Sequence, residues 1–511
     1  MLAKVHSAAV LGIDSYPIEI EVNYGWGQPA VVIVGLPDAA VKESKDRVKT
    51  AIENSGFKYA LGRTTINLAP ADVKKEGPSF DLPIAIGILS VSEQIGAKDL
   101  GEFAMVGELA LSGEVRSVNG VLPIALCARA QKKRGLIVPA DNAPEAAVVK
   151  GIEVYPAKTL REVAEFLSGK RGIAPLQEDP NQIFQQQRRY DIDFSDVKGQ
   201  EHVKRAIEVA AAGGHNALMI GPPGSGKTLL ARRVPTIMPD TTLEEALETT
   251  KIHSIMGLLP KGQALVATRP FRSPHHTTSN AGLLGGTSNL TPGEVSLAHH
   301  GVLFLDELPE FHRDVLEALR EPLEESRVVI SRASGTMVFP ANFMLIAAMN
   351  PCPCGFYGDP KRECRCSPAM IQRYRNKISG PLLDRIDLHV DVPAVKYKEM
   401  AGDSTGETSG AVRRRVEEAR AVQRRRFAGR DGLSCNARMA PKDLKEHCVL
   451  GEESQELLKM AMTELNLSAR AYDRILKVAR TIADLDHAPN IQSEHISEAI
   501  QYRSLDRQMW V

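Results

Sequence analysis

The hydrophobic pattern of the first third of the chain changes period repeatedly. In residues 1 to about 167, short runs rich in β-branched residues alternate with helix-like segments. The clearest β-runs are residues 30–34 and 64–68, and the helix-like segments are residues 39–55, 83–92 and 123–133. This alternation predicts a front domain of the α/β or α+β type.

Two breaks interrupt the pattern further along the chain. The first contains glycine, two prolines and a run of glutamines with little periodicity, which is typical of a linker. A second α/β pattern begins at Phe194, and the tract at residues 402–410 ends it before a helical C-terminal region. We therefore predict four parts: a front domain (1–167), a linker (168–192), a central α/β domain with a parallel sheet (193–395) and a helical lid domain (396–511).

Composition excludes several classes of protein. Lys and Arg total 63 in the 511 residues, and so do Asp and Glu, so no overall field attracts nucleic acid or membrane. Asp14 and Glu19 interrupt the first apolar stretch, which argues against a signal peptide. The apolar stretch at 83–91 is far shorter than the ~20 residues that span a bilayer. We expect a cytoplasmic protein without a membrane partner.

The strongest motif is GPPGSGKT, which follows an apolar run and precedes a helix-like segment. This is the strand–loop–helix context of a phosphate-binding loop. Glycines allow backbone N–H groups to converge on phosphate oxygens, and the helix start adds the positive end of its dipole. We expect ATP to be bound by Gly221, Pro222, Pro223, Gly224, Ser225, Gly226, Lys227 and Thr228.

Within this loop two side chains have separate expected roles. Lys227 would reach the β- and γ-phosphates, and Thr228 would hold Mg²⁺. A glycine-rich turn that merely resembles the motif is the alternative.

Two later apolar runs end in polar side chains. Residues 301–307 form a buried strand pattern that ends in Asp306 and Glu307. Asp306 would bind Mg²⁺, and Glu307 would orient the water that attacks the γ-phosphate. The second run ends in Asn350, which could hold the same water. Carboxylates that begin a solvated helix, and a turn-forming Asn before Pro351, are the bland alternatives.

Two arginines could act on the phosphates from elsewhere. Arg385 lies between two aspartates in GPLLDRID, and Arg470 lies in a helical segment. A cation at the developing charge accelerates phosphoryl transfer greatly, which favours an arginine finger at Arg385. An ordinary surface ion pair at Arg385 and a solvated helix arginine at Arg470 are the competing interpretations.

These motifs, together with RPFRSPHHTTS, AAMNPCPCGFYGDP and GPLLDRIDLHV, resemble the ComM/YifB family of magnesium-chelatase-like AAA+ ATPases. The likeness extends across essentially the whole chain. It implies a ring-shaped homo-oligomer, a hexamer, that uses ATP and Mg²⁺. It also implies catalytic roles for named residues. Lys227 and Thr228 take the Walker A role, and Asp306 and Glu307 take the Walker B role. Asn350 is sensor 1, Arg385 is the arginine finger and Arg470 is sensor 2. Arg474 lies one turn beyond Arg470 and competes with it for the last role.

The segment RVVISRASGTMVF predicts a β-hairpin around Arg332. In the MCM helicases, which are wider relatives of this family, a hairpin at this point projects a basic residue into the central channel. Arg332 matches that residue and is the candidate for contact with the DNA backbone. An exposed turn whose arginine has no particular role is the equal alternative.

Four of the seven cysteines fall between residues 352 and 366 as two C-x-C pairs. Four thiolates across a short loop can close a tetrahedral Zn²⁺ site, and a reducing compartment favours this over disulfides. We expect structural zinc at Cys352, Cys354, Cys364 and Cys366. Reduced, unliganded thiols or one redox disulfide are the alternatives, since C-x-C is tighter than the usual spacing.

The front domain resembles the Lon-protease-type domain, which is of the S5-like α+β fold. The motifs are GPSFDLP at residues 77–83, VGELALSGEV at 106–115 and GLIVP at 135–139. Ser79 matches the nucleophile, but Leu122 occupies the place of the catalytic lysine. A serine without a nearby base is a poor nucleophile, so we expect no proteolysis.

Three functions remain to be separated. The leading hypothesis is an ATP-driven ring on single-stranded or branched DNA, with the helicase or branch-migration role that the family likeness implies in natural transformation and homologous recombination. Recombination proteins are then possible partners. The second hypothesis is an ATPase that remodels a protein partner, as in magnesium insertion into porphyrin. The third, an ATP-dependent protease, is opposed by Leu122.

Overall fold

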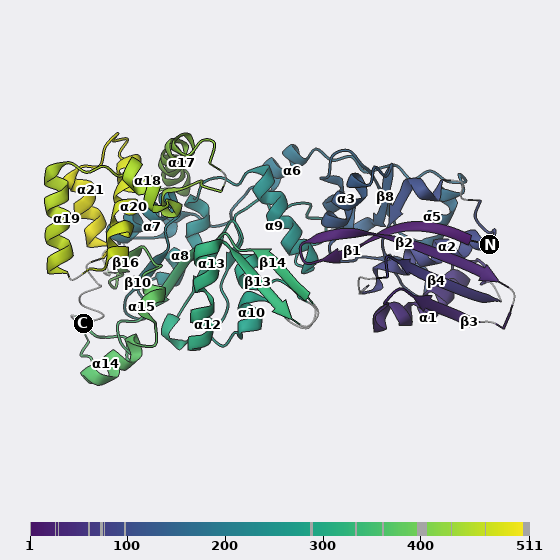
Figure 1. Ribbon diagram of the computed structural model, residues 1–511, viewed down its shortest axis with the longest axis horizontal. Helices are drawn as coiled ribbons and strands as arrows, with labels where there is room; N and C mark the ends of the chain where they lie inside the picture. The colour runs from purple at the N-terminus through teal and green to yellow at the C-terminus, as the bar shows by residue number, and fades with distance from the viewer. Residues whose placement is uncertain are drawn as a thin grey trace. The chain divides into compact units, whose positions relative to one another are not determined.

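The computed structural model describes residues 2–25, 27–28, 30–59, 62–71, 75, 77–96, 99–286, 290–332, 335–359, 362–395, 406–430, 432–465 and 467–503. The chain forms two compact units (Figure 1). The first unit consists of Met1–Arg188 and Thr242–Ala267, and the second unit consists of Arg189–Thr241 and Thr268–Val511.

A seven-stranded mixed sheet forms the framework of the first unit. In spatial order its strands are β3 (Ala30–Val34), β4 (Arg63–Ala69), β2 (Asp14–Gly25), β1 (Leu2–Leu11), β5 (Phe103–Met105), β8 (Gly135–Pro139) and β9 (Glu153–Ala157). β2 pairs antiparallel with β1 and β4, and the other neighbours are parallel. A two-stranded ribbon of β6 (Glu108–Leu109) and β7 (Val115–Arg116) accompanies the sheet.

Helices cover this sheet. They are α1 (Ala39–Asn54), α2 (Asp81–Val91), α3 (Val121–Ala130), α4 (Ala143–Ala147), α5 (Leu160–Leu167), α6 (Pro180–Gln187) and α9 (Leu243–Ile255). Helix α2 is apolar on all sides and almost every residue in it is buried, as expected for a helix in the middle of a core. The predicted strands and helices at 30–34, 39–55, 64–68 and 83–92 are each present within two residues of their predicted ends.

Helix α9 joins the first unit from the middle of the chain. Thr242 begins it with a capping box, in which the Glu245 amide donates to Thr242 Oγ1 at 3.1 Å and the Thr242 amide donates to Glu245 Oε2 at 3.0 Å. Near its end, the carbonyl oxygen of Ser254 accepts a hydrogen bond from the Gly120 amide at 3.1 Å. This segment lies inside residues 193–395, which the sequence assigned to the central domain.

A five-stranded parallel sheet forms the framework of the second unit. In spatial order its strands are β11 (Phe271–Arg272), β12 (Val302–Leu305), β15 (Met344–Met349), β10 (Ala217–Ile220) and β16 (Leu388–Asp391). All neighbours are parallel. Every residue of β10, β12 and β15 is buried, which explains their continuous apolar sequences.

Other elements of the second unit surround this sheet. They are α7 (Glu201–Gly213), α8 (Lys227–Ile237), α10 (Asn280–Leu284), α11 (Glu294–Leu297), α12 (Arg313–Ala318), α13 (Arg320–Glu325), α14 (Pro368–Arg375), α15 (Gly380–Leu383), and the antiparallel hairpin of β13 (Arg327–Arg332) and β14 (Gly335–Pro340). The turn residues 333–334 of the predicted hairpin lie outside the described residues.

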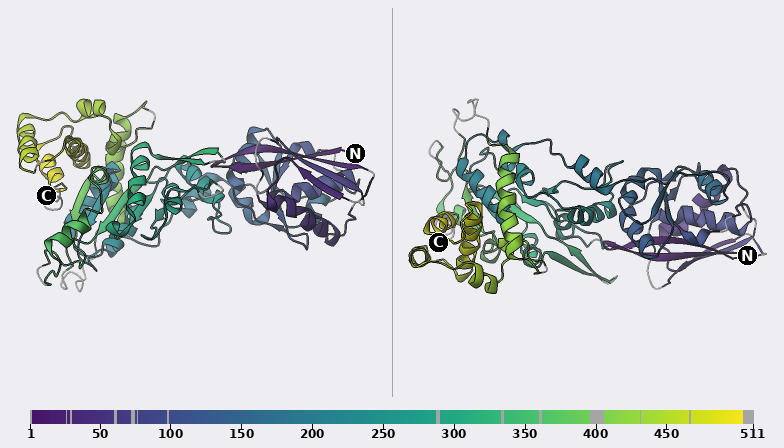
Figure 2. Two further views of the ribbon diagram at one scale, coloured as in Figure 1. Left: turned by 60° about the horizontal axis from the view of Figure 1, so that its bottom comes forward. Right: turned by 90° about the horizontal axis from the view of Figure 1, so that it is seen from above.

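The C-terminal region is helical. It contains α17 (Ser409–Arg426), α18 (Pro441–His447), α19 (Glu452–Glu464), α20 (Ala469–Leu485) and α21 (Ser493–Gln501), which Figure 2 shows grouped at the C-terminal end in yellow-green. Helices α17 and α20 pack on α7. The buried carboxylate of Asp484 holds this region together by binding Arg426 at 2.8 Å and Arg480 at 3.0 Å.

The predicted fold class is therefore confirmed: an α/β protein with a central parallel sheet and a helical C-terminal region. Residues 168–192, predicted as a linker, include α6, whose Ile183 and Phe184 are buried. Part of the tract predicted to precede the lid, residues 396–405, lies outside the described residues. Within the described residues, no helix combines the length and apolar character needed to cross a membrane.

Candidate active site

The loop between β10 and α8 requires glycine at defined positions. A Cβ at Gly221 would lie 2.1 Å from the carbonyl oxygen of Val392, which no side chain could tolerate. Gly224 and Gly226 have φ angles of +76° and +90°, in the region that glycine adopts without strain. The sequence GPPGSGKT therefore forms a tight loop that leads directly into the first turn of α8.

Lys227 folds back over this loop. Its Nζ donates to the carbonyl oxygens of Gly221 at 2.7 Å and Pro222 at 3.0 Å, and it reaches Oδ1 of Asn350 at 3.3 Å. Burial lowers the pKa of the Lys227 ammonium, because the charged form is separated from water. The carboxylates of Asp306 and Glu307 act in the opposite direction and favour the charged form, so the ammonium lies where a phosphate and its metal ion would meet these groups.

The carboxyl ends of three parallel strands meet beside Lys227. Thr228 Oγ1 donates to Asp306 Oδ2 at 2.8 Å, and the Glu307 amide donates to Asp306 Oδ1 at 2.9 Å. Glu307 is exposed and has a φ angle of +53°. The predicted residues from β10, β12 and β15 therefore lie together, and we call Lys227, Thr228, Asp306, Glu307 and Asn350 the ATP site.

Sequence reasoning missed one residue of this site. His276 follows β11, and its Nδ1 lies 3.3 Å from Oε2 of Glu307. Its ring also meets the ring of Phe311 edge-on, with 6.4 Å between centroids. The two adjacent histidines of RPFRSPHHTTS could have indicated this contact, but in the sequence they only contribute to the family motif.

Arg385 and Arg470 lie in a different place. They share a cavity of about 130 Å³ with Glu324, Asp384 and Arg474. An Nη2 of Arg385 lies 2.5 Å from Glu324 Oε1, and an Nη1 of Arg470 lies 3.4 Å from Asp384 Oδ2. We call this group the arginine pocket. Neither arginine makes an ion pair or hydrogen bond with a described residue of the ATP site.

Arg385 and Arg470 differ in exposure. Arg385 is buried, and burial lowers the pKa of its guanidinium. The side chain of Arg470 is 67% exposed. Arg474, the competing sensor residue, also lines the pocket and lies 2.9 Å from the buried carboxylate of Asp387.

The four predicted zinc ligands lie together. Cys352 Sγ is 3.4 Å from Cys354 Sγ and 3.7 Å from Cys364 Sγ, and Cys354 Sγ is 3.6 Å from Cys364 Sγ. All four sulfur atoms lie within 4.8 Å of one another. A hydrogen bond from the Phe356 amide lowers the pKa of the Cys354 thiol to about 6.

The cysteine loop touches the phosphate-binding loop. A Cβ at Gly355 would lie 2.5 Å from Cδ of Pro223, so the two loops are in van der Waals contact. The guanidinium of Arg375 also donates to the carbonyl oxygen of Pro351 at 3.2 Å. Sequence alone placed this loop between the strand that ends in Asn350 and the helix that carries Arg385, but did not indicate that it packs on the phosphate-binding loop.

Arg332 lies at the end of β13, beside the hairpin turn. It is exposed, and its Nε donates to the carbonyl oxygen of Gly286 at 3.2 Å. A Cβ at Gly286 would lie 2.7 Å from the Ile330 side chain, so the hairpin packs closely on this segment.

Several arginines of α17 are engaged within the protein. Arg413 donates to the Thr236 carbonyl oxygen at 2.8 Å, Arg415 binds Glu208 at 2.5 Å, and Arg426 binds Asp484. These three therefore tie α17 to its neighbours. Arg414 and Arg424 are exposed.

Ser79 has no lysine partner at the expected place. Ser79 lies in a short 3₁₀ helix at Pro78–Phe80, and Leu122 is completely buried in α3. The Leu122 amide donates to the buried carboxylate of Glu145 at 2.7 Å. The position that a catalytic lysine would occupy thus belongs to the apolar core.

Three family models match the chain. Their descriptions are "Subunit ChlI of Mg-chelatase" for residues 20–142, "Magnesium chelatase, subunit ChlI" for residues 193–400 and "Magnesium chelatase, subunit ChlI C-terminal" for residues 406–503. Together they account for most of the chain.

Full-length relatives are also found. The competence protein ComM of Haemophilus influenzae is 46% identical over 510 residues, which cover 99% of this chain and 98% of that protein. The protein YifB of Escherichia coli is 45% identical over 507 residues, which cover 99% and 98% of the two chains. Lon protease 2 of Bacillus subtilis is 28% identical over 181 residues, about a third of each chain.

Proposed function

The chain belongs to the ComM/YifB family of magnesium-chelatase-like AAA+ ATPases, and from this premise we propose that it is a ring-forming motor that hydrolyses ATP and acts on DNA. The convergence of Lys227, Thr228, Asp306, Glu307 and Asn350 is the observation that carries the hydrolytic part. The Haemophilus relative is named a competence protein, which supports a role in natural transformation. Helicase or branch-migration activity in the integration of incoming strands is the finer part of our proposal.

Nucleotide binding uses groups that the loop already presents. Lys227 exchanges the Gly221 and Pro222 carbonyl oxygens for oxygens of the β- and γ-phosphates. The loop amides and the first turn of α8 hold the remaining phosphate oxygens. A nearby polyphosphate favours the charged form of Lys227, against the effect of burial.

Thr228 and Asp306 fit a magnesium ion. Mg²⁺ takes oxygen ligands at 2.0–2.1 Å in an octahedron, whose adjacent corners are about 2.9 Å apart. The Thr228 and Asp306 oxygens are 2.8 Å apart and belong to a hydroxyl and a carboxylate, both suitable ligand types. The ion supplies charge neutralisation for the phosphates when it is bound.

Hydrolysis requires a positioned water, which Glu307 and Asn350 orient. The Glu307 carboxylate accepts a proton of the attacking water. The side-chain amide of Asn350 contacts the γ-phosphate. His276 binds Glu307 at 3.3 Å and keeps its carboxylate from turning freely before the water arrives.

Arg385 and Arg470 complete the site of a neighbouring subunit. They lie together in the arginine pocket and have no contact with the described ATP-site residues of their own chain, which supports action in trans. A cation supplied by an adjacent subunit stabilises the transition-state charge. Hydrolysis then depends on assembly, and we propose a hexamer.

The four cysteines hold a structural zinc ion. Zinc–sulfur bonds of about 2.3 Å in a tetrahedron place the sulfur atoms about 3.8 Å apart. The three measured separations of 3.4–3.7 Å are close to that value. Four thiolate ligands leave no open position, so the ion stiffens the loop that packs on Pro223 rather than taking part in chemistry.

DNA contact is proposed at the β13–β14 hairpin. Arg332 is exposed at its end, and six copies in a ring concentrate positive charge that the neutral chain lacks. The proposal also includes the domain boundaries 1–167, 168–192, 193–395 and 396–511, and a front domain without proteolytic activity. Arg332→Ala should lose DNA-stimulated hydrolysis and keep basal hydrolysis.

The test of this function is ATP hydrolysis with and without DNA. Purified protein is assayed alone and with single-stranded, duplex and branched DNA, with Glu307→Gln as the inactive control. Strong stimulation that decreases with salt supports the DNA motor. Hydrolysis that is indifferent to all three DNAs contradicts it and favours an ATPase that remodels a protein partner.

A further inference from the structure

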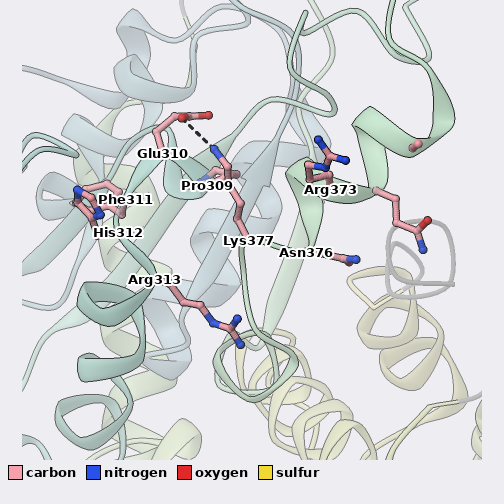
Figure 3. A pocket seen from close by; sticks show the side chains of 10 residues that line it. Pro309, Glu310, Phe311, His312, Arg313, Arg373, Asn376 and Lys377 are labelled. Carbon is pink, nitrogen blue, oxygen red and sulfur yellow. Dashed lines mark hydrogen bonds and ion pairs between the residues drawn. The ribbon is translucent and has the colours of Figure 1, made fainter.

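A basic cavity of about 790 Å³ in the second unit has no part in the chemistry above. It lies between the segment that follows β12 and helix α14 (Figure 3). Arg313, Arg373 and Lys377 line it. Lys377 pairs with Glu310 at 3.2 Å, whereas Arg313 and Arg373 have no partner among the residues drawn there. Both arginines are exposed.

The basic cavity adjoins the ATP site along the chain on two sides. One wall, Pro309–Arg313, begins two residues after Glu307. The other wall, α14, follows the cysteine loop that begins after Asn350. A molecule that fills the cavity therefore lies beside the catalytic end of the sheet, where a neighbouring subunit must approach to deliver an arginine.

Helices α12 and α13 connect this cavity with the arginine pocket. Arg313 begins α12, and Glu324 in the last turn of α13 holds Arg385 at 2.5 Å. The exposed residues of α13 are acidic, namely Glu321, Glu324 and Glu325. One chain thus presents Arg313, next to the exposed Asp314, at the start of α12, and the carboxylates of α13, of which Glu325 pairs with Arg327 at 3.5 Å. A head-to-tail interface between identical subunits joins two such different surfaces.

We propose that α13 of a second copy of this chain docks its carboxylates in the basic cavity. The proposal rests on the proposed ring and names the surfaces that build it. Charge complementarity selects this partner, because the cavity offers Arg313 and Arg373 and α13 offers three exposed carboxylates. An acidic protein surface fits better than DNA, since the docked helix also carries the arginine pocket towards the ATP site.

Docking also releases the arginine finger. In a single chain Glu324 neutralises Arg385 and keeps it buried in the arginine pocket. When Glu324 takes Arg313 or Arg373 of the neighbour as its new partner, Arg385 is free to turn towards the neighbour's ATP. Unassembled subunits bind ATP and do not hydrolyse it.

Charge reversal tests the contact. Assembly is measured by sedimentation velocity with saturating ATP in the Glu307→Gln background, so that the measurement does not depend on hydrolysis. Arg373→Glu and Glu321→Lys should each raise the concentration of half-assembly by roughly tenfold, because each places like charges together. The double variant should return to within about threefold of the parent. Lys459→Glu, an exposed reversal on α19, is the matched control and should assemble as the parent does.

Three outcomes overturn the proposal. In the first, the parent does not assemble. In the second, the single variants assemble at the same concentration as the parent. In the third, the double variant needs as high a concentration for half-assembly as the single variants. If Arg373→Glu assembles normally and binds DNA more weakly, the cavity is a DNA site instead. If the variants assemble and are rescued as expected but the wild-type protein has no ATPase activity, the interface is supported and the proposed function is contradicted.

Discussion

The ATP site and the arginine pocket are built in opposite ways. In the ATP site, Lys227 and Thr228 from the first turn of α8 lie beside side chains from the ends of β12 and β15, and Glu307 remains exposed to solvent. In the arginine pocket, Arg385 is buried and bound to Glu324 of its own chain. Under the proposed function, the ATP site is one half of a phosphoryl-transfer centre and is open to its ligand, whereas Arg385, the proposed other half, is paired within its own chain.

This difference indicates where the reaction is controlled. In the proposed reaction, a single chain binds nucleotide, and the cation that stabilises the transition state comes from a neighbouring subunit whose Glu324 has exchanged Arg385 for another partner. In this proposal, control by assembly follows from one carboxylate, Glu324, which exchanges Arg385 for an arginine of the neighbouring subunit, and it needs no large movement of the core.

Loss of the finger should have the largest effect. Arg385→Ala should reduce kcat about 10³-fold, since an arginine supplied in trans contributes at least that factor in phosphoryl transfer. ATP affinity, measured with a fluorescent nucleotide, should stay within about twofold of wild type. If ATP affinity fell as much as kcat, Arg385 would belong to the ATP-binding residues, and the contrast between the two regions would disappear.

Loss of the carboxylate that orients water should come next. Glu307→Gln should lower kcat by about 10²-fold and keep ATP binding, because the amide retains the shape but accepts protons poorly. Lys227→Ala is the matched variant, which should lose binding itself. If Glu307→Gln hydrolysed ATP at the wild-type rate, another residue would orient the water.

Two neighbouring arginines of α20 should separate catalysis from stability. Arg474→Ala leaves the buried Asp387 carboxylate without its 2.9 Å partner, and should reduce the free energy of unfolding by about 2 kcal/mol. Arg470→Ala should leave stability unchanged, because the side chain is exposed, and lower kcat about tenfold. Denaturant unfolding and steady-state kinetics measure the two effects. A reversed result would assign the sensor role to Arg474.

Removal of the metal should have the smallest effect on the chemistry. We expect one zinc per chain by atomic emission, lost in Cys366→Ser and kept in Cys127→Ser, which lies outside the cluster. Loss of zinc should lower the rate of hydrolysis roughly fivefold, because the cysteine loop touches the phosphate-binding loop where Gly355 meets Pro223. This effect is well below the roughly hundredfold loss of rate that a 1 Å misplacement of reacting groups can cause. Zinc-free, fully active wild-type protein would contradict this prediction.

The sequence predicted which residues meet at the strand ends, because the signals are local. Strands β10, β12 and β15 are continuous apolar runs; the phosphate-binding loop follows β10, and Asp306 and Asn350 directly follow β12 and β15. The cysteines also cluster in the sequence before they cluster in space. Such features depend only on neighbours along the chain and on the rule that parallel strands end at one edge.

Other features could not be predicted, because they depend on distant pairs. Nothing in residues 242–267 indicates that α9 packs with a core built from the first 188 residues. Glu324 meets Arg385 across 61 positions, and His276 meets Glu307 across 31. The arginines of α17 read locally as a basic face, although several of them bind carboxylates elsewhere in the fold.

The measurement that tests the central claim most directly is hydrolysis by mixed subunits. Lys227→Ala and Arg385→Ala proteins, each inactive alone, are mixed in equal amounts under assembling conditions. If the finger acts across a head-to-tail interface, about one interface in four joins an intact ATP site to an intact arginine, and about a quarter of wild-type activity should return. A mixture as inactive as its components would contradict completion of the ATP site by a second copy.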